Sequence, residues 1–325
     1  MQLNLKNLSI PKKALVTLPD FNSDFSKLNQ QTYKTVSPAE AFVPAFDRSF
    51  HFGDSIYEVV RTYEGILFGF KEHLLRLKKS AELGLYTELP DLELAEKLFN
   101  QTIRAYYKEF GNGNVYARIT YSRGIGDLNI DPKYSSVPYM VVFVKELENY
   151  PAELYAKGTH FAIVKRRRNL SSAVDPAMKS GNYLNNVLAI AEATQLGAQD
   201  ALMLNVDGFV TEGTTNNFFY IKAGRLITAP LSVGILAGIT RDFIFEICQQ
   251  NKIPIEERLF TVENLLNADE MFMSSSTKEI VPITKLNRKN VADGSPGPLT
   301  KRCHELYKLK LKKFVADNQS SSLYL

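Results

Sequence analysis

Residues 212–219 read EGTTNNFF and residues 236–241 read LAGITR, and these two stretches are the most informative part of the 325-residue chain. Glu212 stands at a predicted strand end and begins a polar turn, where a carboxylate is either a simple turn acid or the counter-ion of a protonated ring nitrogen. Gly238 leads into a predicted helix, whose first amides lack intrahelical partners and favour anions. Neither this helix start nor the run of hydroxyl residues at 274–277 is followed by the G-K-[ST] ending of a nucleoside triphosphate loop. A phosphate-bearing cofactor therefore fits better than a nucleoside triphosphate.

Two further features of the sequence are relevant to a phosphate-bearing cofactor. A run of hydroxyl residues at 274–277 follows a predicted strand, and Lys179 lies between a basic strand and an apolar helix. Each feature alone is also typical of an ordinary turn or surface residue. A buried lysine, however, loses proton affinity and becomes an amine nucleophile. A lysine, a carboxylate and two phosphate-type turns together are what pyridoxal phosphate requires.

Composition places the chain among globular proteins, with 45% hydrophobic and 23% charged residues. Its length corresponds to about two domains. The longest apolar runs are far shorter than the roughly 20 residues of a membrane-spanning helix, and residues 1–9 lack the apolar core of a signal peptide. Cys248 and Cys303 form neither a metal-ligand spacing nor a disulfide framework. We therefore expect a cytoplasmic protein.

The patterns of helix and strand predict an α+β (mixed α/β) fold in two domains. Residues 1–40 are weakly patterned, and we expect them to form an N-terminal extension. Residues 41–150 form the expected small α/β domain, and residues 151–325 the expected large domain. In the small domain we predict helices at 71–83 and 92–110 and strands at 115–121 and 139–144. In the large domain, hairpin turns are predicted at Asp207-Gly208 and Ala223-Gly224.

Other functional classes have little support in the sequence. The cluster Lys165-Arg166-Arg167-Arg168 is typical of a solvated strand end or of a basic rim above an anionic ligand, and no aromatic residues interleave with it as base stacking would require. The four histidines form no i,i+4 pair and have no cysteine partners, so we expect no metal site. No serine or cysteine lies in a recognisable nucleophile elbow.

The informative stretches together resemble the signature of the class IV aminotransferase family. Glu212, NFF at 217–219, LIT at 226–228 and LAGITR at 236–241 reproduce it. Further segments similar to the family are DRSFHFGDSIYE at 47–58, EHLLRL at 72–77 and ADEMFMSSSTKE at 268–279. The resemblance extends over residues 44–310. It implies a class IV aminotransferase-like fold with a smaller N-terminal α/β domain and a larger, cofactor-binding C-terminal domain that has a barrel-like sheet.

The resemblance also implies which residues bind pyridoxal 5'-phosphate. Lys179 corresponds to the catalytic lysine, which binds the cofactor covalently and then moves the α-proton of the amino acid as general acid and base. Glu212 corresponds to the partner of the pyridine nitrogen, and Tyr183 to the donor to the phenolic oxygen. The implied phosphate-binding residues are Arg76, Ile239, Thr240, Ser275 and Ser276.

The substrate-binding residues implied by the resemblance are Phe52, Tyr57, Tyr116, Arg118, Arg123 and Thr277. The sequences YAR at 116–118 and GITRD at 238–242 resemble the branched-chain enzymes. The spacing between Lys179 and Tyr183 instead resembles the D-amino-acid enzymes and the aminodeoxychorismate lyases, as does SRG at 122–124. The sequence SST at 275–277 resembles the D-amino-acid type.

The expected function is transamination of L-branched-chain amino acids with 2-oxoglutarate, as in amino-acid biosynthesis. The alternatives are a D-amino-acid aminotransferase, a 4-amino-4-deoxychorismate lyase, and an inactive protein that binds a cofactor or a partner. The expected ligands are an amino acid and a 2-oxo acid, and we expect neither nucleic acid nor membrane as a partner. The family also implies a homodimer in which both subunits line the pocket.

Overall fold

The computed structural model describes residues 10–23, 31–148 and 150–324, and the chain divides into two compact units. The first unit contains Met1–Glu148, Met178–Asn182 and Asp317–Leu325, and the second contains Asn149–Ala177 and Tyr183–Ala316. Among the described residues, no helix combines the length and the apolar character needed to cross a membrane.

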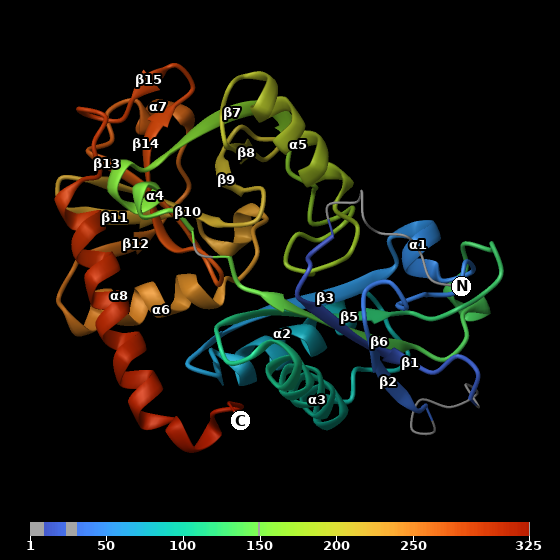
Figure 1. The fold of residues 1–325 in the computed structure, drawn as a ribbon. Helices are drawn as coiled ribbons and strands as arrows, with labels where there is room; N and C mark the ends of the chain where they lie inside the picture. The colour runs from blue at the N-terminus through green and yellow to red at the C-terminus, as the bar shows by residue number, and fades with distance from the viewer. Residues whose placement is uncertain (1–9, 24–30, 149, 325) are drawn as a thin grey trace. The chain divides into compact units, whose positions relative to one another are not determined.

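The first unit is built on an antiparallel sheet of six strands in the order β2-β1-β6-β5-β3-β4. The strands are β1 (Ala14–Pro19), β2 (Tyr33–Val36), β3 (Ser55–Tyr63), β4 (Ile66–Leu67), β5 (Val115–Ser122) and β6 (Tyr139–Glu146). The short helix α1 (Arg48–Phe52) precedes β3 and is capped by the Asp47 side chain. Helices α2 (Phe70–Leu83) and α3 (Leu92–Phe110) cover one face of the sheet (Figure 1).

The bounds of α2 and α3 follow from their sequence. In α3, Leu98, Phe99 and Ile103 recur at helical spacing and are at most 1% exposed. The Asp91 side chain accepts hydrogen bonds from the first amides of this helix, as N-cap residues do. The predicted helices at 71–83 and 92–110 are confirmed to within one residue.

The N-terminal segment differs from the expected extension. All six residues of β1 are buried, and the strand pairs with β2 on one side and β6 on the other. Its polar residue, Thr17, tolerates burial because its hydroxyl is hydrogen-bonded to those of Thr35 (2.7 Å) and Thr102 (2.6 Å). Residues 1–9 and 24–30 of the expected extension lie outside the described residues.

The second unit is built on a mixed sheet of nine strands that forms a half-barrel. Eight strands follow the order β12-β11-β10-β13-β14-β7-β8-β9, and β15 pairs with β14. The strands are β7 (Thr159–Arg167), β8 (Asp200–Leu204), β9 (Val210–Gly213), β10 (Asn217–Lys222), β11 (Arg225–Thr228), β12 (Ile255–Glu257), β13 (Glu270–Ser275), β14 (Glu279–Leu286) and β15 (Lys289–Asn290). The predicted mixed α/β fold is therefore confirmed.

The helices of the second unit pack against this sheet. They are α4 (Ala152–Lys157), α5 (Leu184–Gln195), α6 (Ile239–Gln250), α7 (Val262–Leu265) and α8 (Pro298–Asp317). Helix α5 connects β7 to β8, which are parallel and so require a crossover. Helices α6 and α8 lie side by side (Figure 1), and the rings of Phe243 and Tyr307 contact each other with their centres 6.4 Å apart.

Candidate active site

The predicted catalytic lysine lies in a short segment that pairs with β3 of the first unit. The Tyr57 N–H donates to the Lys179 carbonyl (2.9 Å), and the Gly181 N–H donates to the Ser55 carbonyl (2.6 Å). The Lys179 N–H donates to the Ser80 hydroxyl (3.1 Å). A Cβ at position 181 would collide with the Ser55 hydroxyl, so a larger residue there would force that side chain to move. The segment therefore fixes the lysine backbone, and its Nζ lies 4.5 Å from the centre of the Tyr57 ring.

A buried carboxylate in the same unit holds the predicted phosphate-binding arginine. Glu58 is 0% exposed, and it accepts hydrogen bonds from Arg76 Nε (2.7 Å) and Nη2 (2.8 Å). His73 Nδ1 lies 2.7 Å from the same carboxylate. Burial alone raises the pKa of Glu58, but the charge and hydrogen bonds of Arg76, together with the hydrogen bond of His73, outweigh it and hold the pKa well below its usual range. Glu58 is therefore ionised and orients the Arg76 guanidinium.

His73 contributes to this cluster as a neutral donor. Burial lowers the pKa of His73 below its usual value, and the nearby Arg76 and Lys179 cations act in the same direction, although Glu58 opposes them. Because the Glu58 carboxylate can only accept a hydrogen bond, the imidazole proton lies on Nδ1. The other nitrogen, Nε2, is buried and has no hydrogen-bond partner among the described residues.

Two of the predicted substrate-binding residues of the first unit are stacked on each other. The Arg118 guanidinium lies 3.8 Å from the centre of the Tyr57 ring, and its Nε donates to the Thr120 hydroxyl (3.3 Å). Tyr116, two residues earlier on β5, is half-buried. Phe52 at the end of α1 is 36% exposed and contacts the Arg48 guanidinium. Arg118 is therefore held by an aromatic face, and its terminal nitrogens have no hydrogen-bond partner within the described ranges.

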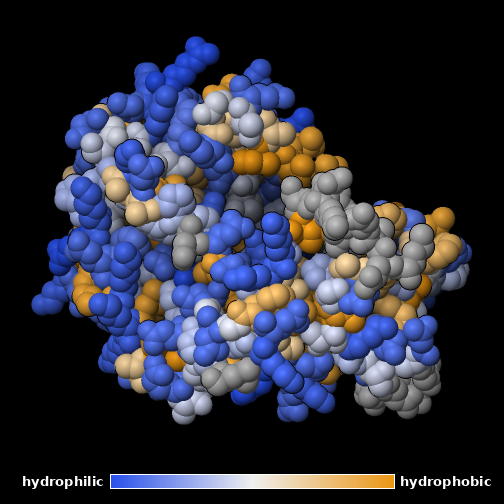
Figure 2. All heavy atoms as spheres, in the orientation of Figure 1, coloured by the Kyte–Doolittle hydropathy of each residue, from blue (hydrophilic) through white to orange (hydrophobic). Residues whose placement is uncertain are grey.

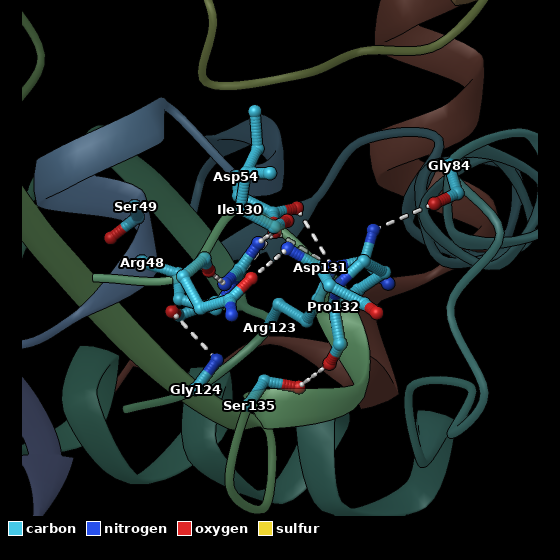
Figure 3. A network of polar contacts seen from close by, with 12 residues as sticks. Arg48, Ser49, Asp54, Gly84, Arg123, Gly124, Ile130, Asp131, Pro132 and Ser135 are labelled. Atoms are coloured by element: carbon cyan, nitrogen blue, oxygen red, sulfur yellow. Dashed lines mark hydrogen bonds and ion pairs between the residues drawn. The ribbon is translucent and has the colours of Figure 1, made fainter. Parts of the chain in front are cut away.

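Arg123, the other predicted carboxylate-binding residue, has an internal partner (Figure 3). Its Nε donates to both oxygens of Asp54 (2.9 and 2.8 Å), and its terminal nitrogens donate to the carbonyls of Gly84 (2.7 Å) and Leu85 (3.2 Å). Arg48 donates to the same Asp54 carboxylate (2.9 Å). These bonds differ from the expected contact with substrate, because they use Arg123 to tie the end of α2 to the start of β3.

In the second unit, Glu212 is 4% exposed and lies at the end of β9. Its Oε1 accepts a hydrogen bond from Arg168 Nη2 (2.6 Å), and its Oε2 accepts one from the Asn217 amide (3.0 Å). The Leu236 N–H lies 3.3 Å from both oxygens. The Asp200 carboxylate supports this turn by accepting hydrogen bonds from the Thr214 N–H, the Thr214 hydroxyl and the Asn216 side-chain amide. Glu212 is thus a fixed, ion-paired carboxylate.

The predicted anion site at the start of α6 has the expected geometry. Gly238 is the N-cap of this 12-residue helix, and no side chain caps its first amides. Thr240 is 2% exposed, and its hydroxyl has no hydrogen-bond partner among the described residues. A Cβ at position 238 would collide with the Asn217 side chain. The Ile239 and Thr240 amides, which no side chain caps, lie beside a hydroxyl without a partner among the described residues, and such an arrangement is suited to a phosphate group.

The remaining predicted residues of the second unit lie in two places. At the end of β13, the Ser274 hydroxyl is buried without a partner among the described residues, and the Ser275 hydroxyl accepts a hydrogen bond from the Lys278 N–H (3.2 Å) in the turn that follows. Ser276 and Thr277 are half-buried in this turn, and Tyr183 is half-buried at the N-cap of α5. No group of three or more metal-binding side chains occurs in the part of the chain that the structure describes.

The sequence analysis missed the residues that hold the predicted groups in place. Glu58 and His73 lie inside the quoted segments 47–58 and 72–77, but no role was assigned to them. Arg168 was grouped with three neighbouring basic residues, which are exposed, whereas its own side chain is 10% exposed and pairs with Glu212. Arg168 and Glu212 are 44 residues apart, so no local sequence pattern indicates that they pair, and only the structure could identify Arg168 as the partner of Glu212.

Comparison with known proteins adds to this geometry. The profile of amino-transferase class IV matches residues 55–286. The putative branched-chain-amino-acid aminotransferase of Methanocaldococcus jannaschii is 33% identical over 275 residues, which are 85% of this chain and 93% of that protein. The D-alanine aminotransferase of Staphylococcus aureus (strain COL) is 36% identical over 275 residues, which are 83% of this chain and 93% of that protein.

A solved structure is also similar. The branched-chain amino acid aminotransferase of Thermobaculum terrenum in its PLP form superposes with a TM-score of 0.77 and 25% identity, covering 92% of this chain and 93% of that one. The family match spans most of the chain and includes the segments that carry Lys179 and Glu212. The chain therefore belongs to the class IV aminotransferases, which are enzymes that depend on pyridoxal 5'-phosphate.

Proposed function

We propose that this protein transfers the amino group of L-branched-chain amino acids to 2-oxoglutarate. The contrast between Arg118 and Arg123 carries this proposal. Arg118, which belongs to the branched-chain YAR sequence, is stacked on Tyr57 with its terminal nitrogens available to a carboxylate. Arg123, which belongs to the SRG sequence shared with the D-amino-acid enzymes and the lyases, is bonded to Asp54 and two carbonyls. The names of the Methanocaldococcus and Thermobaculum relatives agree with this substrate class.

The proposal assigns a role to each cofactor-binding residue. Lys179 binds the cofactor covalently, and Glu212 pairs with its ring nitrogen. The residues proposed for the phosphate are Arg76, Ile239, Thr240, Ser275 and Ser276, and Tyr183 is proposed for the phenolic oxygen. The unpaired Thr240 hydroxyl and the uncapped start of α6 support the phosphate assignment, because both groups need an acceptor when buried. The ion-paired state of Glu212 supports its assignment to a cationic ring nitrogen.

The chemistry then divides between the cofactor and this chain. Bound pyridoxal phosphate supplies an electron sink for the electrons left on the α-carbon of the amino acid. With its amine free, Lys179 would take the proton from that α-carbon as general base and would deliver it, as general acid, to C4′ of the cofactor rather than back to the α-carbon. Tyr57, whose ring faces Nζ, limits the orientations that this amine can adopt. Arg118 binds the substrate carboxylate, and Phe52, Tyr116 and Thr277 are the other proposed substrate contacts.

The proposal includes a homodimer and a cytoplasmic location. Phe42, Val43, Phe46 and Phe50 of the first unit are between 48% and 73% exposed. On the second unit, the exposed apolar face of α5 is visible as an orange area in Figure 2. Exposed apolar patches of this kind mark protein interfaces, and we assign them to a second copy of the chain.

Both cysteines are free thiols, in agreement with a reducing compartment. The division into a small domain and a large cofactor-binding domain is part of the same proposal.

The test is a set of half-reactions with the purified holoenzyme. L-leucine, L-isoleucine, L-valine, L-glutamate, D-alanine, D-glutamate and aminodeoxychorismate are each mixed with the enzyme while its visible cofactor band is followed. We expect the L-branched-chain amino acids and L-glutamate to bleach the band, and Lys179→Ala to lack covalently bound cofactor. Bleaching by D-amino acids alone would refute the proposed substrate class.

A further inference from the structure

The side chain of Arg168 is largely buried in the second unit, whereas the three basic residues that precede it in the sequence are exposed. Lys165, Arg166 and Arg167 at the end of β7 are exposed. The Arg168 N–H donates to the Leu204 carbonyl (2.8 Å), which fixes its backbone beside β8. Its side chain is 10% exposed. A guanidinium at this depth needs acceptors and a negative charge, because a buried unpaired charge is strongly unfavourable.

The two terminal nitrogens of Arg168 have different partners. Nη2 donates to Glu212 Oε1 (2.6 Å), and Nη1 donates to the Asn186 side-chain oxygen (3.1 Å). Asn186, on α5, is 6% exposed and is itself fixed by donating to the Thr214 carbonyl (2.5 Å). The planar guanidinium therefore spans from α5 to the Glu212 carboxylate in one orientation, which a flexible lysine would not reproduce.

The same carboxylate is linked to the predicted phosphate site. The side-chain amide of Asn217 donates both to Glu212 Oε2 (3.0 Å) and to the Leu236 carbonyl (3.0 Å). The Leu236 N–H in turn donates to Glu212 Oε1 (3.3 Å). Leu236 lies two residues before Gly238, the N-cap of α6. A change in the orientation of Glu212 would therefore be transmitted to the turn that precedes the α6 amides.

We propose that Arg168 is a positioning residue that keeps Glu212 ionised and correctly oriented toward the cofactor, without touching the substrate. This inference rests on the proposed role of Glu212. Without the arginine, a carboxylate that is 4% exposed would lose the countercharge 2.6 Å from its Oε1, and burial would then favour the protonated form more strongly. A protonated carboxyl group is a poorer partner for a cationic ring nitrogen. The loss would act on the chemical step more than on amino-acid binding.

The experiment compares Arg168→Met and Arg168→Lys with Arg167→Met, a matched control on the exposed neighbour. For each holoenzyme we measure the half-reaction rate, the KM for L-leucine and the pH dependence of the visible cofactor band. For each apoprotein we measure the Kd for pyridoxal phosphate and the Tm. We expect Arg168→Met to lower the rate about tenfold or more, as the loss of a supporting residue behind a ligand typically does. We expect its KM to stay within about twofold, since only transition-state stabilisation is removed, and Arg167→Met to match the wild type.

A double-mutant cycle decides whether Arg168 acts through Glu212. If it does, Arg168→Met will have little further effect on the rate or on the band in a Glu212→Gln background, because coupled residues are not additive. Equal effects in both backgrounds, or an Arg168→Met variant that matches Arg167→Met, would overturn the inference. If Arg168→Met does not fold by circular dichroism, Arg168→Lys takes its place in the cycle.

The cycle also separates this inference from the proposed function. A Glu212→Gln enzyme with unchanged rate would remove the proposed role of Glu212 and the inference with it. A wild-type enzyme that transaminates only D-amino acids would refute the proposed substrate class and leave the cycle valid, with a D-amino acid as the reactant.

Discussion

Replacing Glu58 by glutamine tests the buried cluster that holds Arg76. The carboxylate accepts two hydrogen bonds from Arg76 and one from His73, and none of it is exposed. Glutamine retains one acceptor oxygen, but its NH2 group would face a donor of Arg76 or His73. Removing one member of a buried ion pair costs about 3–5 kcal/mol. In a domain of about 150–250 residues, each 1 kcal/mol lowers the Tm by about 2–4 °C, so we expect a fall of about 6–20 °C.

The assay is differential scanning calorimetry of the apoprotein, combined with hydrogen exchange of peptides from β3 and α2. The matched control is Glu82→Gln, on the same helix. Glu82 pairs with Lys79 at 3.3 Å, but the two side chains are 43% and 64% exposed, so its loss should cost less than about 1 kcal/mol. If Glu58→Gln shifts the transition no further than Glu82→Gln does, the cluster is not a major source of stability for the first unit.

Further predictions concern pH, phosphate and substrate carboxylate. The pKa of His73 lies below its ordinary 6.5 and that of Glu58 below its ordinary 4.5, so the unfolded chain binds more protons than the folded chain as the pH falls. The free energy of unfolding should therefore decrease below about pH 6.5 and again below about pH 4.5. His73→Asn should remove the first of these decreases in urea titrations. Thr240→Val should leave the apoprotein Tm unchanged or higher, because no described residue forms a hydrogen bond with the hydroxyl. The same variant should weaken pyridoxal phosphate binding about tenfold, and Thr240→Ser should restore the binding. An unchanged Kd for Thr240→Val would exclude Thr240 from the phosphate site. Arg118→Ala should raise the KM for the amino acid with little change in Tm. Arg123→Ala should instead lower the Tm, because it removes the hydrogen bonds to Asp54. The reverse pattern would reassign the contact with the substrate carboxylate from Arg118 to Arg123.

The regular elements that the sequence predicted are those with strong local signals. Helix α3 has an apolar stripe, an N-cap aspartate and a glycine beyond its last residue. The turns at Asp207-Gly208 and Ala223-Gly224 are confirmed, and Gly208, Ala223 and Gly224 have the positive φ values that such hairpin turns require. In each case, residues close in sequence determine the conformation.

The strands of the N-terminal segment lacked such a signal. Strand β1 is six residues long, and its burial depends on pairing with β6, more than 120 residues away. Thr17 interrupts its apolar pattern, and its partner Thr102 lies on α3. Because neither the pairing nor the hydroxyl partner is visible locally, the segment resembled an extension.

For the site, the sequence analysis predicted which groups face the ligands and assigned no role to the residues that bond to those groups. Lys179, Glu212 and Thr240 belong to motifs in which residue type and spacing are restricted by the chemistry. Arg168 and His73 are restricted only by a carboxylate distant in the chain. A buried arginine and a surface arginine are identical in sequence, and the difference appears only when the partner is known.

The two units use the same ion pair for opposite purposes in the proposed enzyme. In the first unit Arg76 faces the ligand and Glu58 supports it, because the ligand group there is an anionic phosphate. In the second unit Glu212 faces the ligand and Arg168 supports it, because the ligand group there is a cationic ring nitrogen. In both cases the supporting residue also neutralises the functional charge when no cofactor is bound, so that neither charge is buried uncompensated in the apoprotein. This arrangement explains why Arg76 and Glu212 each have a buried partner of opposite charge, and why removing that partner should affect the apoprotein as well as the loaded enzyme.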